Sequence, residues 1–162
     1  MVHSVLLCDT PGAISALHAA MRHTPDLVVD VSTDALRAIE AAGRIRPDSI
    51  CCRLSMDGFA GLDLLTRFQS VSPESAMVVR LSLDDLAIAS TCLRAGARGI
   101  VATDDDPATC LEVVSAVAER SATVALSSRV AFDLGITLGD RLTETDRLRV
   151  ELDGLRESVS QG

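Results

Sequence analysis

Residues 77–102 read MVVRLSLDDLAIASTCLRAGARGIVA. The apolar runs Met77–Leu81 and Gly99–Ala102 each predict a buried strand, because they are short, rich in branched side chains and followed by polar residues. The apolar period between them predicts a helix whose core-facing residues are Leu86, Ala89 and Leu93. Asp84 or Asp85 is expected to cap this helix, and Gly96 to end it. A strand, a helix and a strand in this order predict a unit of a parallel sheet.

The same alternation continues toward both ends of the chain. Further strands are predicted at Ser4–Cys8, Leu27–Val31 and about Ser49–Leu54. The predicted core-facing helix residues are Ile14, Leu17 and Met21; Leu36, Ile39 and Ala42 of a helix over Thr33–Ala42 that Gly43 ends; Leu62, Leu65 and Phe68; and Leu111, Val114 and Val117. The fold class is therefore α/β, a doubly wound five-stranded parallel sheet with a C-terminal helical extension. In this architecture the functional crevice lies beyond the carboxyl ends of the strands.

Composition excludes several classes of function. The chain has 162 residues, 23 acidic against 15 basic residues and a net charge of -8, so its field repels nucleic acid and anionic lipid. All 15 basic residues are Arg, which excludes any chemistry that needs a Lys amine. No apolar run is long enough for a membrane span, and the N-terminus does not resemble a secretory signal. We therefore expect a cytoplasmic protein without direct nucleic-acid or membrane binding.

The cysteines, histidines and clustered aspartates do not have the spacing that a metal-binding or catalytic site requires. The five cysteines have no C-x-x-C spacing, so we interpret them as small buried side chains of a reducing compartment. A nucleophile at Cys8 is the rival interpretation, and it would need a nearby base. The acidic run 104–106 precedes Pro107, where a helix is predicted to begin. The positive end of the helix dipole stabilises aspartates at this place, so we prefer this interpretation to a metal cluster. We expect no metal and no cofactor.

Three stretches carry a resemblance to a known family. They are Arg46-Pro47-Asp48 before the third strand, Met56-Asp57-Gly58 followed by Gly61-Leu62, and the block Arg94-Ala95-Gly96-Ala97-Arg98-Gly99. Over about residues 2–118 the chain resembles the receiver domain of bacterial response regulators, especially the branch with LuxR-type outputs. The resemblance implies two acids after the first strand, an aspartate acceptor on the third, a hydroxyl after the fourth and a lysine after the fifth.

The chain departs from that pattern at most of these positions. Asp9 keeps the first acid, whereas the other positions carry Thr10 at the second acid, Arg53 at the acceptor, Leu81 at the hydroxyl and Thr103 at the lysine. A register slip would instead place Ser82 at the hydroxyl. A guanidinium stays protonated and has no lone pair to attack phosphorus, so Arg53 cannot accept a phosphoryl group. We expect Arg53 either to pair with Asp9 in place of a metal ion or to extend into water. Asp57, in the turn, is the only substitute acceptor nearby.

The C-terminal part carries a different pattern. We expect a pseudo-receiver domain over 1–120, a linker over 121–141 that allows a short helix near Arg129–Leu134, and an amphipathic helix over 142–162. The helix has a narrow apolar stripe formed by Leu148, Leu152, Leu155 and Val159. Such a stripe fits a seam between two copies of the chain or docking on the domain, and we favour the seam.

Three classes of function remain after these exclusions. The favoured one is a non-enzymatic, phosphorylation-independent pseudo-receiver in signal transduction or transcription control, which contacts a second copy or another regulatory protein. The alternatives are a small-molecule sensor, and a phosphoryl acceptor that uses an unusual residue. The chain could also be the receiver part of a longer DNA- or RNA-binding response regulator.

Overall fold

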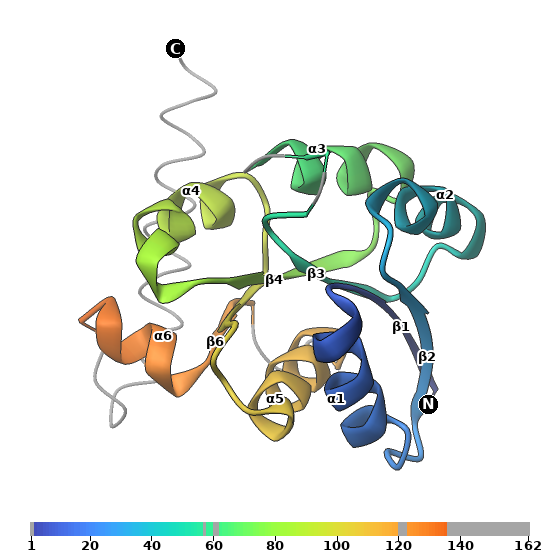
Figure 1. Cartoon of the computed structure of the whole chain (residues 1–162), viewed down its shortest axis with the longest axis horizontal. Helices are drawn as coiled ribbons and strands as arrows, with labels where there is room; N and C mark the ends of the chain where they lie inside the picture. Colours follow the sequence, from blue (N-terminus) through green and yellow to red (C-terminus); the bar gives the residue numbers. More distant parts are fainter. Residues whose placement is uncertain (1, 57, 60–61, 120–122, 136–162) are drawn as a thin grey trace.

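The computed structural model describes residues 2–56, 58–59, 62–119 and 123–135. Within them one parallel sheet has the strand order β2-β1-β3-β4-β5-β6 (Figure 1). The strands are β1 (His3–Cys8), β2 (Leu27–Ser32), β3 (Ser49–Arg53), β4 (Ala76–Leu81), β5 (Gly99–Ala102) and β6 (Ala125–Leu126). The predicted doubly wound α/β class is confirmed.

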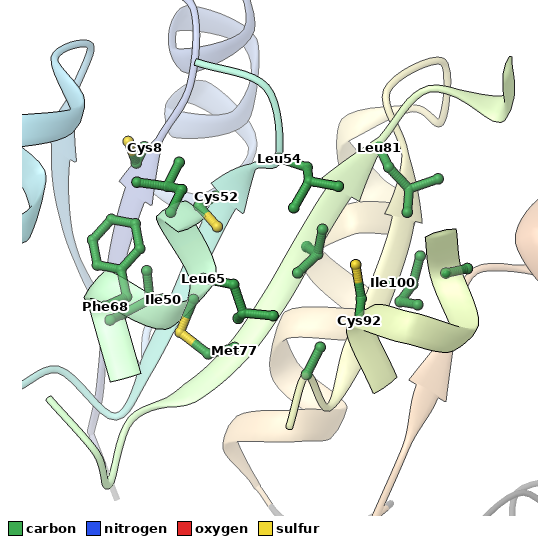
Figure 2. Close-up of a cluster of buried hydrophobic side chains, with 14 of the residues drawn as sticks. Cys8, Ile50, Cys52, Leu54, Leu65, Phe68, Met77, Leu81, Cys92 and Ile100 are labelled. Atoms are coloured by element: carbon green, nitrogen blue, oxygen red, sulfur yellow. The ribbon is translucent and has the colours of Figure 1, made fainter. Parts of the chain in front are cut away.

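Helices cover both faces of the sheet (Figure 1). They are α1 (Pro11–Met21), α2 (Ala35–Ile45), α3 (Leu62–Val71), the 3-10 helix η1 (Leu83–Ile88), α4 (Ala89–Arg94), α5 (Pro107–Ala118) and α6 (Ser128–Asp133). The larger core cluster lies between the sheet and α2, α3 and α4, and includes Phe68, Ile50 and Leu81 (Figure 2). The smaller one lies under α1 and α5. No helix among the described residues is long and apolar enough to cross a membrane.

The sheet has six strands where five were predicted. The sixth, β6, pairs with β5 through Gly99 with Ala125 and Ile100 with Leu126. It lies in the segment predicted to be a linker. The same segment contains α6, which agrees with the short helix expected near Arg129–Leu134, and whose Val130 and Ala131 are buried in the larger cluster. A strand of two residues is too short to produce a periodic pattern, so the sequence did not indicate it.

The core-facing side of α2 differs from the prediction. Ala35, Ala38 and Ala42 are buried, whereas Leu36 is 62% exposed and Ile39 is half-buried. The prediction is thus confirmed at Ala42 and wrong at Leu36, because Ala35 and Ala38 occupy the rest of the face that packs on the core. The helix also does not stop at Gly43, because it continues to Ile45.

The α4 region also corrects the prediction. The cap is Ser82, which accepts a hydrogen bond from the Asp84 backbone nitrogen at 3.2 Å, rather than Asp84 or Asp85. After this helical segment the chain turns into β5 through Gly96, whose φ of +109° favours glycine. At Gly99 an added Cβ would lie 3.0 Å from side-chain atoms of Val78 and of Val113. The glycine therefore lets α5 approach the sheet closely.

The cysteines are buried free thiols, as expected. Cys51 and Cys52 lie in opposite core clusters, because neighbouring residues of a strand point to opposite faces. Burial, with the nearby Asp9 and Asp34 carboxylates adding to it, raises the pKa of Cys8 to about 12. A thiol with so high a pKa is almost fully protonated near neutral pH, which argues against the nucleophile interpretation.

Candidate functional site

The carboxyl ends of the central strands bring four residues together. Asp9 follows β1, Arg53 ends β3, Arg80 lies in β4 and Thr103 follows β5. The register of the sheet places Arg53 directly beside Arg80. Parallel strands end at the same edge, so side chains from distant parts of the sequence meet there.

Arg80 and Asp9 form a buried ion pair at this edge. The Arg80 guanidinium donates through Nη1 to Oδ2 of Asp9, and the two residues are 5% and 1% exposed. Nη2 of Arg80 donates to the Thr103 carbonyl oxygen at 3.3 Å. The Thr10 backbone nitrogen donates to the other Asp9 oxygen, Oδ1, at 2.7 Å. Arg80 therefore connects the ends of β1, β4 and β5.

Arg53 lies farther from Asp9 than Arg80 does. Its Nη1 is 3.8 Å from Oδ1 of Asp9, which is within ion-pair distance, and its side chain is 33% exposed. The geometry thus agrees with an arginine that reaches Asp9, but the closer partner is Arg80. A charged residue within the apolar run of β4, all of whose residues are buried, was the available signal for Arg80.

The other residues singled out in the sequence have structural roles or lie elsewhere. Leu81, which the resemblance placed at the hydroxyl position, packs in the larger core cluster. Ser82 caps η1 with its side chain. Thr10 is the N-cap residue of α1 and Thr103 contributes its carbonyl oxygen. Asp57 and the stripe formed by Leu148, Leu152, Leu155 and Val159 lie outside the described residues.

The acidic run before α5 acts locally. Asp106 caps α5 by accepting from the Thr109 backbone nitrogen at 2.8 Å, and hydrogen bonding by Thr109 lowers the pKa of this carboxyl. Oδ2 of Asp105 accepts a hydrogen bond from the Ala102 backbone nitrogen. Oδ2 of Asp104 lies 3.9 Å from Nη1 of Arg129. The prediction that this run begins a helix is confirmed. Among the residues that the structure describes, no group of three or more His, Cys, Asp or Glu side chains could hold a metal ion.

A cavity of about 480 Å³ lies beside this edge of the sheet. Thr10 and Pro11 line it after β1, and Ser55 and Met56 after β3. The strand order reverses between β1 and β3, which is where doubly wound sheets commonly bind ligands. The cavity is therefore a candidate small-molecule site, although Asp9, Arg53 and Arg80 are not among its lining residues.

Comparisons by sequence found no match: no family model matches the chain, and no curated protein does.

Solved structures do match the fold. A LuxR-family two-component response regulator from Aurantimonas sp. SI85-9A1 is 20% identical with a TM-score of 0.73, over 83% of this chain and 96% of that one. The receiver domain of AraT, a response regulator from Geobacillus stearothermophilus, is 26% identical with a TM-score of 0.62, over 75% and 96%. The receiver domain of RcsB from Salmonella enterica serovar Typhimurium, solved with the phosphomimetic BeF3-, is 18% identical with a TM-score of 0.69, over 80% and 99%. The chain therefore has the fold of response-regulator receiver domains, including LuxR-family ones.

Proposed function

We propose that this chain is a phosphorylation-independent regulatory pseudo-receiver, which acts in signal transduction or transcription control through protein contacts and not as an enzyme. The observation that carries the proposal is the buried ion pair between Arg80 and Asp9, with Arg53 at the end of the neighbouring strand. Arg53 lies at the position where the resemblance to receivers implies an acceptor carboxylate, and Arg80 lies beside it in β4.

The chemistry of these residues supports the proposal. An acyl phosphate requires a carboxylate oxygen that attacks phosphorus, and a protonated guanidinium cannot replace it. The Mg²⁺ that assists phosphoryl transfer is usually bound by one or two carboxylates. Here both oxygens of Asp9 already have donors, Arg80 on Oδ2 and the Thr10 nitrogen on Oδ1. The donor set of the described residues therefore does not fit the ion.

The first prediction is that the chain does not take up phosphate. After incubation of the full chain with acetyl phosphate and Mg²⁺, we expect an unchanged intact mass, because no carboxylate stands at the end of β3. A receiver domain that retains its acceptor aspartate serves as the positive control for the donor. A gain of one phosphoryl group by this chain would contradict the proposal, and loss of that gain in Asp57→Asn would identify Asp57 as the acceptor.

The proposed partner is a second copy of the chain, joined through the stripe of Leu148, Leu152, Leu155 and Val159. The sequence pattern supports a helical seam, since a helix this short is marginal unless it packs on something. Another regulatory protein is the alternative partner for the same stripe.

Light scattering tests the seam. We expect the full chain to have the mass of a dimer and a version ending at Gly135 to have the mass of a monomer, because this cut keeps β6 and α6, which belong to the folded domain. Leu152→Gln should weaken the dimer, whereas the neighbouring Glu151→Gln should not. A monomeric full chain, or a dimer that survives the truncation, would contradict the seam.

A further inference from the structure

Two buried thiols face each other between the sheet and α5. Sγ of Cys51, in β3, lies 3.8 Å from Sγ of Cys110, near the start of α5, and either sulfur can donate the hydrogen bond between them. All five cysteines lie in the described part of the chain, and this is the one sulfur–sulfur hydrogen bond among them. The two residues are 59 positions apart in the sequence, so it is the fold that brings them together.

The thiol pair lies where α5 packs closely on the sheet. Both cysteines are 1% exposed and belong to the smaller core cluster. Val78 is the neighbour of Cys51 in the sheet, and Val113 lies one turn beyond Cys110 in α5. A Cβ added at Gly99 would lie 3.0 Å from both of these valines. The sheet and the helix are therefore in close contact beside the two sulfurs.

The surroundings make Cys110 the better nucleophile of the two. The hydrogen bond with Cys51 lowers the pKa of the Cys110 thiol more than burial raises it, and the positive charge of Arg80 lowers this pKa further. The same hydrogen bond raises the pKa of Cys51 well above its ordinary value. The thiolate is the form that attacks an oxidant, so we expect Cys110 to react first and Cys51 second.

The distance between the sulfurs suits a disulfide. The sulfur atoms of a disulfide are about 2.05 Å apart. The separation of 3.8 Å must therefore shrink by roughly 1.8 Å, or about 0.9 Å for each sulfur. Rotation about the Cα–Cβ bond of each cysteine can move its sulfur this far without displacing the backbone.

We infer that Cys51 and Cys110 form an intramolecular disulfide when the folded chain meets a peroxide, and that a dithiol reduces this bond again. Sγ of Cys110 attacks one oxygen of hydrogen peroxide, and the other oxygen leaves as hydroxide, which takes the thiol proton and becomes water. Cys110 is then a sulfenic acid. Sγ of Cys51 loses its proton and attacks the sulfenic sulfur, and the hydroxide that leaves takes this proton to become the second water. The two sulfurs together lose two electrons, which the peroxide gains.

The burial of the thiols determines the class of oxidant. Hydrogen peroxide is uncharged and little larger than water, so it can enter through local opening of the packing around α5. The bond would tie α5 to β3 and make an oxidant an input of the domain. This inference goes beyond the proposed function and does not depend on it, because it uses neither Arg53 nor the C-terminal stripe.

Intact mass and thiol counting on the full chain test the inference. After treatment with hydrogen peroxide without denaturant, we expect a loss of about 2 Da, which is two hydrogen atoms. N-ethylmaleimide in urea should then label three of the five cysteines, since two are joined, and all five after dithiothreitol. An unchanged mass, oxygen added to single cysteines or a disulfide between any other pair would overturn the inference.

Matched alanine variants assign the bond. Cys51→Ala and Cys110→Ala should each abolish the loss of two hydrogens, because each leaves one sulfur without its partner. Cys52→Ala is the control, since it makes the same change in the adjacent residue of β3, whose side chain lies in the larger core cluster. This variant should lose two hydrogens like the wild type. The same loss in Cys110→Ala, or no loss in Cys52→Ala, would overturn the assignment.

Thermal unfolding shows whether the folded chain accommodates the bond. A disulfide between residues 59 positions apart closes a long loop in the unfolded chain, so oxidation should raise the Tm of the wild type. We expect a rise of about 5 °C or more. Cys110→Ala should show no rise after the same treatment. A Tm of the oxidised wild type that stays the same or falls would overturn the inference that the bond fits the folded chain.

Discussion

Arg80→Met is expected to lower the free energy of unfolding by about 3–5 kcal/mol, because it leaves the Asp9 carboxylate buried without its closest cation. Asp9 is only 1% exposed, so water cannot readily replace the guanidinium. Nη1 of Arg53 lies 3.8 Å from Oδ1 of Asp9, so this second cation still partly stabilises the carboxylate in the variant. We therefore expect a loss of stability toward the lower end of that range. For a chain of this size, the corresponding fall in Tm is about 6–20 °C.

Urea denaturation of three variants measures this change in the free energy of unfolding. It also distinguishes the loss of the ion pair from the loss of any arginine side chain. Arg94→Met removes an exposed arginine of α4 and should change stability by less than about 0.5 kcal/mol. The double variant Arg80→Met with Asp9→Leu should recover most of the loss, because an apolar pair removes both buried charges together. A single Arg80→Met variant as stable as Arg94→Met would show that the ion pair does not hold the ends of β1 and β4 together.

The strands of this fold could be predicted well from the sequence because each is a short, nearly continuous apolar run. Gly99–Ala102 agrees at both ends with the structure, and the other predicted strands agree within one residue at each end. Such runs are typical of parallel strands, which are buried on both faces. Amphipathic helices were placed well where large apolar side chains face the core, as at Leu17 and Met21, and less well in α2, where alanines do.

The site was predicted only in part because its key residue depends on strand register. The resemblance placed Leu81 at the hydroxyl position of the site, but Arg80 is the residue beside Arg53. A shift of one residue along a strand reverses the face to which each side chain points. Asp9 could be identified because turn residues follow β1 directly, and Arg53 because Pro47, Asp48 and Gly58 flank its strand. The end of β4 continues into Ser82 and Leu83 without a glycine or proline.

The other large effect is expected at the centre of the larger core cluster. Phe68 is fully buried, and it is the one buried aromatic side chain within the described residues. It extends from α3 toward the sheet and lies close to Ile50 of β3 (Figure 2). Phe68→Ala should lower the free energy of unfolding by about 3–5 kcal/mol, since it removes buried apolar surface and leaves a cavity.

Phe132→Ala is the matched control, because it makes the same chemical change in α6 where the ring is 77% exposed, and it should cost less than about 0.5 kcal/mol. Urea unfolding curves of both variants, fitted with a common slope, give the comparison. Equal losses would contradict the assignment of Phe68 to the core.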